Sequence, residues 1–235
     1  MVPQLRHMLS EPLRKRAAAT FVGNHADFFS ALGGNAQLHQ WLRLNQPFGY
    51  FKNRYQLYGD IQARILDTEP IDYLEFGVRN GDSIFKWATL NTNSNSRFIG
   101  FDSFEGLPED WVSVTGTAPK GSFSVAGIVP ATNDPRVRFI KGWFCNTLRP
   151  FLQDFRPRSR LVIHNDADLY SSTLYTLSTL DPFLRPSSIL IFDEFANPLH
   201  EWRAFRDYIT AFGRSGRVLG ASGEYYTQVA IELMQ

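Results

Sequence analysis

Acidic side chains follow two apolar segments of the chain, at the point where each segment ends. They are Asp166 and Asp168 after residues 161–165, and Asp193 and Glu194 after residues 189–192. Four carboxylates gathered in one partly dry cleft would repel one another, and each would resist ionisation. A cation resolves this conflict, and oxygen ligands without a neighbouring cysteine favour Mg²⁺, with Mn²⁺ or Ca²⁺ as other occupants. The alternative is that Asp166 and Asp193 cap helices and the other two acids are solvated, but the recurrence on two segments favours the cation.

A glycine-containing turn lies upstream of these acids. The apolar segment 71–76 ends at Gly77 and Gly81, a helix-like run follows, and the next apolar segment ends in Asp102. This order of strand, glycine turn, helix, strand and acid is how proteins usually hold nucleoside-bearing cofactors. We expect positive φ at both glycines, where a Cβ would collide with the ligand, and ribose hydroxyl groups bound by Asp102. An ordinary strand-to-helix turn with Asp102 as a cap is the alternative.

Two details of this turn select the cofactor. The glycines are spaced Gly77-x-x-x-Gly81, not Gly-x-Gly-x-x-Gly, and Glu75 lies inside the first strand, where it can compensate backbone donors or, through water, an ammonium group. These details fit S-adenosylmethionine better than NAD. Ser83, with Asp82, is expected to cap the following helix, near whose N-terminus the carboxylate of the cofactor would be favoured.

The segments that carry these residues alternate between strand-like and helix-like patterns, which is typical of a mostly parallel sheet covered on both faces. The strand candidates are 71–76, 97–101, 137–141, 160–165 and 188–192. Helical spacing predicts core positions at Tyr55, Tyr58, Ile61 and Ile65, and at Leu174, Leu177, Leu180 and Leu184. Near the end of the sequence, Arg217–Leu219 and Tyr225–Leu233 flank Gly220–Gly223, which predicts an antiparallel hairpin.

Composition narrows the class of protein. A chain of 235 residues suffices for one large α/β domain, and its net charge of +1 argues against nucleic acid or a membrane surface as a partner. The basic cluster Arg14–Arg16 is short. The single cysteine, Cys145, excludes an intramolecular disulfide and a cysteine-based zinc site, and its apolar neighbours predict a packed thiol. Because Ala17–Val22 is too short for a secretory core and no apolar run approaches the length of a transmembrane helix, we expect a cytoplasmic protein.

Two stretches fall outside the alternation of strands and helices. Residues 1–50 contain aromatic, helical-looking pieces, and residues 112–135 are rich in Gly, Ser, Thr and Pro. Long irregular segments in compact enzymes often serve as lids or substrate loops, so we predict that both lie over the strand ends and shape an acceptor pocket. For residues 1–50 the alternative is a helical cover over an exposed flank, and this aromatic segment also suits a contact within a homo-oligomer. For residues 112–135 the alternative is a disordered loop.

Five stretches of the sequence together resemble the macrocin O-methyltransferase (TylF-like) family of class I S-adenosylmethionine-dependent methyltransferases. They are Leu74–Ser83, Gly100–Trp111, Ile140–Phe144, Asp166–Thr173 and Ile191–Phe195, in family order over most of the chain from about Tyr55 onward. The run Phe101–Pro108 is the most specific of them. Two departures from the family pattern are the second acidic pair, usually Asp-Asp but here Asp193-Glu194, and Tyr170-Ser-Ser-Thr173, where the family has Tyr-Glu-Ser-Thr.

The resemblance implies a Rossmann-like α/β fold: a mostly parallel seven-stranded sheet with helices on both faces and a C-terminal antiparallel hairpin. Residues 51–235 would form this methyltransferase domain, and residues 1–50 a helical cover or lid. The implied reaction is methylation of a hydroxyl group on a small molecule, a natural-product sugar or a related polyhydroxylated or phenolic acceptor, with S-adenosylmethionine as donor and Mg²⁺ or Mn²⁺ bound.

The resemblance also implies roles for individual residues. The cofactor would be held by Glu75, Gly77, Gly81, Ser83, Asp102, Ser103, Gly142 and Trp143, with the Gly142–Trp143 turn against the adenine. The metal would be held by Asp166, Asp193 and Glu194. The general base is expected to be Asp168 or Asp166, with His164 behind them, because a histidine at the end of a strand is more often a hydrogen-bonded scaffold residue.

Three other functions remain open from the sequence. A nicotinamide-dependent oxidoreductase would share the glycine turn and Asp102 but would not need four acids on later strands. A metal-dependent hydroxylase-like relative of the same fold would keep the acids and lack methyl transfer. A non-catalytic binding protein on this scaffold would tolerate the loss of Asp166, since a fold does not fix its chemistry.

Overall fold

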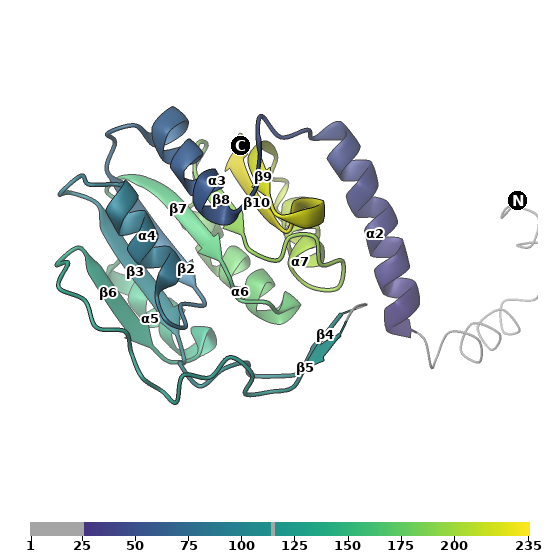
Figure 1. Ribbon diagram of the computed structural model, residues 1–235, viewed down its shortest axis with the longest axis horizontal. Helices are drawn as coiled ribbons and strands as arrows, with labels where there is room; N and C mark the ends of the chain where they lie inside the picture. Colours follow the sequence, from purple (N-terminus) through teal and green to yellow (C-terminus); the bar gives the residue numbers. More distant parts are fainter. Residues whose placement is uncertain (1–25, 114–115) are drawn as a thin grey trace, which may run out of the picture.

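The computed structural model describes residues 26–113 and 116–235, and it is built on one eight-stranded sheet (Figure 1). In spatial order the strands are β1 (Tyr50–Phe51), β9 (Gly216–Ser222), β10 (Gln228–Leu233), β8 (Ile189–Phe192), β7 (Arg160–Asn165), β2 (Ile71–Phe76), β3 (Arg97–Asp102) and β6 (Val137–Lys141). Strand β10 runs antiparallel to β8 and β9, and the remaining neighbours pair in parallel. The predicted Rossmann-like methyltransferase fold with a C-terminal antiparallel pair is confirmed, and the two-residue β1 adds an eighth strand to the seven expected.

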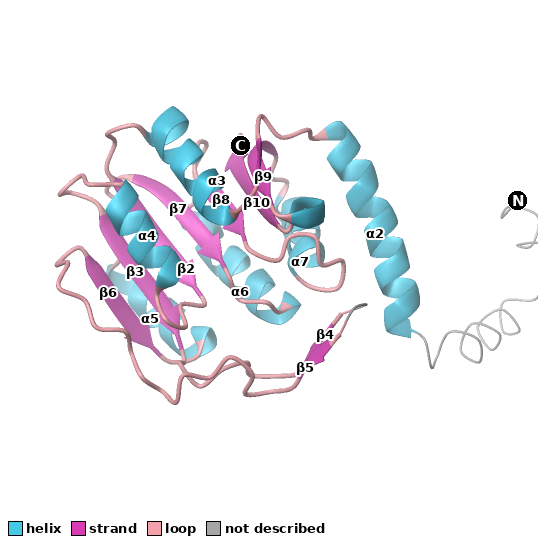
Figure 2. Cartoon of the chain, viewed as in Figure 1, coloured by secondary structure: helices cyan, strands magenta, loops and turns pink. Residues whose placement is uncertain are grey.

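Helices cover both faces of the sheet (Figure 2). One face carries α3 (Arg54–Ile61), its π-helical continuation Gln62–Leu66 and α4 (Asp82–Leu90). The other carries α5 (Phe144–Asp154), α6 (Tyr170–Leu180) with the 3₁₀ turn Asp181–Phe183, α7 (Glu201–Phe212) and α2 (Ala26–Leu44). Alternate residues of a strand point to opposite faces. Tyr73 of β2 therefore packs in the core under α3 and α4, while Leu74 and Phe76 pack in the core under α2, α5, α6 and α7.

Two of the sequence predictions for these elements are wrong in detail. Tyr55 lies on the outer side of α3 and is 40% exposed, although it was predicted in the core. The hairpin turn is not at residues 220–223, because β9 continues to Ser222 and the chain reverses through the 3₁₀ turn Glu224–Tyr226. Gly220 is instead a packing glycine: a Cβ there would lie 2.7 Å from a methyl carbon of Leu57.

The strand order places a crevice beside β2. The chain goes from β2 to β3 on one side, and later returns to β7 on the other side of β2. Connections that leave a parallel strand in opposite directions open a gap at the carboxyl ends, which is where doubly wound proteins bind their ligands. The glycine turn and Asp166 follow strands that end at this edge, and Asp102 is the last residue of β3.

The two irregular stretches take different places. Helix α2 packs on α7, and the ring of Trp41 lies 5.4 Å from Phe195 and from Trp202. The stretch 112–135 begins in a two-stranded flap, β4 (Trp111–Val112) and β5 (Thr117–Ala118), below the strand ends in Figure 1. Residues 1–25, which include Arg14–Arg16 and Ala17–Val22, lie outside the described residues. In the described part of the chain no helix has the length and apolarity to span a bilayer.

Candidate functional site

Gly77 and Gly81 adopt the predicted positive φ, +94° and +87°. The reason at Gly77 is an approach of the protein to itself: a Cβ there would lie 2.7 Å from the carbonyl carbon of Asp166 and would overlap the carbonyl oxygen. Gly77 therefore lets the end of β2 lie against the segment after β7. At Gly81 a Cβ would meet the ring of Phe85 at 2.6 Å. Gly81 is also the N-cap of α4, which has no side-chain cap, so the prediction that Ser83 caps this helix is wrong.

Asp102 organises the glycine turn through its carboxylate. One oxygen accepts hydrogen bonds from the backbone N–H groups of Val78 (2.7 Å) and Arg79 (2.8 Å), and the other accepts from Phe104 (2.7 Å). The neighbouring Ser103 hydroxyl accepts from the N–H of Glu105 at 3.1 Å and so shapes the same loop. These bonds fix the Asp102 side chain at the mouth of the crevice, where the sequence predicted a contact with ribose.

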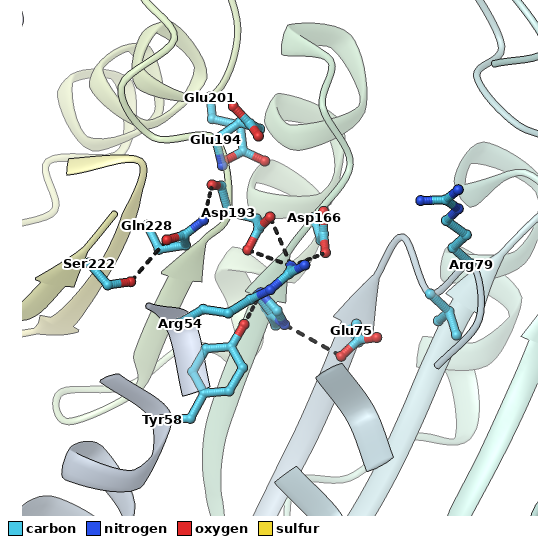
Figure 3. Close-up of polar contacts among 12 residues, drawn as sticks. Arg54, Tyr58, Glu75, Arg79, Asp166, Asp193, Glu194, Glu201, Ser222 and Gln228 are labelled. Atoms are coloured by element: carbon cyan, nitrogen blue, oxygen red, sulfur yellow. Dashed lines mark hydrogen bonds and ion pairs between the residues drawn. The ribbon is translucent and has the colours of Figure 1, made fainter. Parts of the chain in front are cut away.

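Asp166 and Asp193 are brought together by their adjacent strands. The N–H of Asp166 bonds to the carbonyl of Phe76 at 2.9 Å, and the N–H of Asp193 bonds to the carbonyl of Asn165 at 3.0 Å. Each acid is therefore hydrogen-bonded to the end of the neighbouring strand, and both lie at the carboxyl edge of the sheet. With His164 they form a group whose potential ligand atoms all lie within 4.8 Å of one another. Glu194 is outside that group and lies beside Glu201, whose carboxylate accepts from the Glu194 N–H at 2.8 Å (Figure 3).

An arginine that the sequence analysis did not select already bridges this pair. Nη1 of Arg54 lies 2.9 and 3.0 Å from the two carboxylate oxygens of Asp193 and 3.5 Å from Oδ2 of Asp166. Figure 3 shows the guanidinium between the two carboxylates. The only sequence signal for this residue was a basic side chain at the start of a predicted helix, 112 residues from Asp166.

Three carboxyl groups of the site, those of Asp166, Asp168 and Glu194, have raised pKa values, as the sequence analysis expected of acids that share a cleft. Burial and the charges of Asp193 and Asp168 raise the pKa of Asp166 well above its usual range. Burial and the Asp193 charge raise the pKa of Asp168 to about 6 and that of Glu194 to about 7. Asp168 also has a positive φ of +58°, which is rare for a residue other than glycine and concentrates at functional sites.

His164 is held in a buried network behind the acids. Its Nδ1 lies 2.7 Å from the hydroxyl of Tyr73 and 3.4 Å from Oε2 of Glu75, and its Nε2 lies 3.3 Å from the hydroxyl of Tyr58. The Tyr73 hydroxyl also donates to Glu75. His164 and Glu75 are fully buried, and Oε1 of Glu75 has no partner among the described residues. Neither His164 nor Glu75 lines the cavity at the strand ends, so both are placed to orient their neighbours.

A cavity of about 610 Å³ runs along the strand ends. The predicted site residues that line it are Gly77, Ser83, Asp102, Ser103, Trp143, Asp166, Asp168, Asp193 and Glu194. Gly81 and Gly142 do not line it, although Gly142 has a φ of +139° that turns the chain into Trp143. From residues 112–135 it receives Phe123, and from residues 26–50 it receives none.

Two features near the cavity were not expected. Cys145 is exposed at the start of α5 and lines the cavity, so the prediction of a packed thiol is wrong. His200, at the start of α7, links the flap to the segment after Asp168: its Nδ1 accepts from the N–H of Tyr170 at 3.1 Å, and its Nε2 donates to the carbonyl of Val112 at 2.9 Å. The ring of Trp111 stacks on that imidazole at 5.8 Å.

Comparison with known proteins agrees with this geometry. A family model described as a methyltransferase domain matches residues 74–195. The chain is 32% identical over 170 residues to the 8-demethyl-8-(2,3-dimethoxy-alpha-L-rhamnosyl)-tetracenomycin-C 4'-O-methyltransferase of Streptomyces olivaceus, and the match spans 61% of this chain and 62% of that relative's length. It is 28% identical to the mycinamicin III 3''-O-methyltransferase of Micromonospora griseorubida over 66% of this chain and 70% of the relative.

Solved structures agree on the fold. The crystal structure of the calicheamicin methyltransferase CalS11 matches with a TM-score of 0.58 and 24% identity, over 76% of this chain and 77% of that one. At this level of identity the likeness concerns the architecture alone.

Proposed function

The chain belongs to the methyltransferase domain family, within the class I S-adenosylmethionine-dependent methyltransferases, and from this premise we propose that it methylates a hydroxyl group of a small molecule. The observation that carries the proposal is the single cavity at the strand ends. It is lined at once by the glycine turn, by Asp102 and by the acids Asp166, Asp168 and Asp193. The relatives named above are O-methyltransferases by name, which supports an oxygen acceptor.

We assign one end of the cavity to the cofactor. The turn after β2, which Asp102 holds through its bonds to Val78 and Arg79, leaves a concave backbone surface for the nucleoside. Trp143 lines the cavity after Gly142 and offers an aromatic wall for the adenine. When bound, S-adenosylmethionine supplies an activated methyl group, so that the protein mainly has to align the acceptor and remove its proton.

Asp168 is our choice for the residue that takes the proton. Its pKa of about 6 lies closer to neutral pH than that of an ordinary carboxyl, and a general base works best when its pKa is near the working pH. It lines the cavity beside Asp166, and its positive φ directs it from a strained turn after β7. The sequence analysis ranked His164 after the two acids as a candidate general base. Both of its ring nitrogens contact tyrosine hydroxyl groups, those of Tyr73 and Tyr58, which fits a scaffold role.

The donor set fits a divalent cation. Asp166 and Asp193 already converge on one positive nitrogen, that of Arg54, and carboxylate oxygens are the ligands that Mg²⁺ and Mn²⁺ prefer. We propose Asp166 and Asp193 as the ligands, with Glu194 as the predicted third. When bound, the ion lowers the pKa of a coordinated hydroxyl group and so eases its deprotonation.

The acceptor proposed here is a natural-product sugar or a related polyhydroxylated or phenolic compound. The support is twofold: the name of one relative contains a rhamnosyl group, and three hydroxyl-bearing residues, Ser171, Ser172 and Tyr175, line the cavity. We keep the cytoplasm as the proposed compartment, because the single cysteine calls for no oxidising environment.

The test uses Asp166→Asn. The change removes a charge from the acid pair but no atom from the cofactor side, so we expect turnover to be abolished while affinity for S-adenosylhomocysteine stays near that of the wild type. Product mass distinguishes an added methylene from an added oxygen, and so separates methylation from hydroxylation. Stabilisation of the fold by NAD and not by S-adenosylhomocysteine would reject the proposal, and full activity of Asp166→Asn in excess EDTA would reject the metal.

A further inference from the structure

The contact between Arg54 and the acid pair has an unusual form for an arginine. Arginine commonly binds a carboxylate with two nitrogens in a planar fork. Here Nη1 alone makes the three carboxylate contacts, at 2.9 and 3.0 Å to Asp193 and 3.5 Å to Asp166. Among the described residues, the guanidinium of Arg54 makes these contacts with acids through Nη1. A single nitrogen therefore lies where the two carboxylates converge.

Arg54 is able to leave this position without unfolding its helix. Its backbone begins α3, where the side chain of Asn53 caps the helix by accepting from the N–H of Gln56 at 3.1 Å. Its side chain is 33% exposed and lines the cavity. The guanidinium is therefore tethered to a fixed helix end, while its head group borders open space into which it can swing.

The two acids cannot easily stay without a cation. Asp193 and Asp166 are close enough to share one nitrogen, and Asp168 lies next to them in the same cavity. Like charges at such separations destabilise one another, and removing the partner of a buried carboxylate leaves an uncompensated charge. When the guanidinium leaves, the pair must take up either another positive group or a proton.

We propose that Arg54 and a divalent cation compete for the same position between Asp166 and Asp193, so that Arg54 is an exchangeable counter-ion that holds the pair while the metal is away. This inference rests on the proposed function, because it concerns the metal assigned to that site. It assigns Arg54 a positioning role: the side chain keeps the two carboxylates converged, and the affinity for metal is reduced by the fraction of molecules in which Arg54 occupies the pair. A fixed clamp, in which Arg54 and the metal bind side by side, would instead make the arginine neutral or helpful to metal binding.

The test measures Mn²⁺ binding by the full chain, without substrate. Mn²⁺ affinity is followed by the electron paramagnetic resonance signal of the free ion and by calorimetry, for the wild type, for Arg54→Gln and for the control Arg64→Gln. Arg64 lies ten positions on, is paired with Asp60 on the surface and does not line the cavity. We expect Arg54→Gln to bind Mn²⁺ at least about tenfold more tightly, which is the gain if Arg54 occupies the pair in about nine-tenths of the wild-type molecules, and Arg64→Gln to bind like the wild type.

Two further measurements support the same test. Mn²⁺ should raise the melting temperature of Arg54→Gln by more than that of the wild type, because the acid pair of the variant lacks its resident cation. Asp193→Asn should remove the Mn²⁺ binding of both proteins. If Arg54→Gln fails to fold without metal, Arg54→Lys takes its place. Lysine keeps the positive charge on a shorter side chain with one nitrogen, so we expect a smaller gain in affinity for Mn²⁺.

The results that overturn the exchange are distinct from those that overturn the proposed function. Unchanged or weaker Mn²⁺ binding in Arg54→Gln, or no binding in either protein, would reject the competition. Calorimetry with S-adenosylhomocysteine is run on the same samples. If the wild type binds S-adenosylhomocysteine while Arg54→Gln gains no affinity for Mn²⁺, the exchange fails and the methyltransferase proposal stands.

Discussion

Replacing Gly77 by alanine tests whether the strand ends meet as the structure describes. The added Cβ would overlap the carbonyl oxygen of Asp166 and lie 2.7 Å from its carbonyl carbon, and both atoms belong to backbone that cannot rotate away. The φ of +94° at residue 77 is also one that an L side chain rarely adopts. We therefore expect Gly77→Ala to lower the free energy of unfolding and to displace the carboxylate of Asp166.

The size of the loss follows from two contributions. Positive φ costs a residue other than glycine about 1–2 kcal/mol. Relief of the clash moves the Asp166 backbone, whose N–H donates to the carbonyl of Phe76 at 2.9 Å, and loss of such a bond costs about 1 kcal/mol. The expected total is about 2–3 kcal/mol, which for a domain of this size lowers the melting temperature by roughly 4–12 °C.

Gly59→Ala is the matched control for this experiment. Gly59 lies inside α3, and a Cβ there would meet no atom within 4 Å. Alanine in a helix interior is favoured over glycine by about 0.5–1 kcal/mol, so this variant should be as stable as the wild type or slightly more so. Thermal and urea unfolding measure both variants, and calorimetry measures their affinity for S-adenosylhomocysteine. Equal stability of Gly77→Ala and Gly59→Ala would show that β2 does not approach Asp166 as described.

Two further predictions concern the flap and the exposed thiol. Burial lowers the pKa of His200 below its ordinary value, so the stability that neutral His200 contributes is present above about pH 6.5 and is lost as the pH falls through the lowered pKa of the folded state. Protonation removes the acceptor for the N–H of Tyr170. The protection factors of the flap amide groups, which are their exchange rates corrected for the intrinsic dependence of exchange on pH, should therefore fall on acidification, whereas in His200→Phe they should already be low at neutral pH. A fall of equal size in the variant would reject the assignment to His200. Because Cys145 is exposed and lines the cavity, its alkylation by iodoacetamide should slow in saturating S-adenosylhomocysteine or acceptor, and an unchanged rate with both bound would contradict its position.

The strands and their order of appearance were predictable because each is a short apolar run between polar turns. The predicted runs 71–76, 97–101, 137–141, 160–165 and 188–192 match β2, β3, β6, β7 and β8 to within one residue. Burial on both faces leaves the inner strands with a largely apolar sequence, which is a strong local signal. The positive φ of Gly77 and Gly81 was also predictable, because glycine is the usual residue where a turn needs this conformation. The close approach of Gly77 to the Asp166 backbone was not predictable.

The errors arose where distant parts of the chain decide the role of a residue. Gly220 resembled a turn glycine, but the structure uses it to admit a side chain from α3. Ser83 resembled a helix cap, but Gly81 already ends the turn in the left-handed conformation and becomes the N-cap itself. Cys145 has apolar neighbours in sequence, yet it begins a helix at the edge of the cavity and is exposed. Sequence proximity carries no information about these contacts.

The charge balance of the site explains why its acids were predictable and its arginine was not. Four carboxyl groups at two strand ends must bind either a positive group or protons, and this requirement can be read from the sequence. Which cation meets it depends on the reach of a side chain from another element, and α3 brings Arg54 to the acids. One guanidinium offsets one negative charge, and burial together with the charge of Asp193 still raises the pKa of Asp168 to about 6 and that of Glu194 to about 7. The divalent ion that we propose for this site would offset twice as much charge at the same point, and for that reason its entry would be favoured even though an arginine is already there.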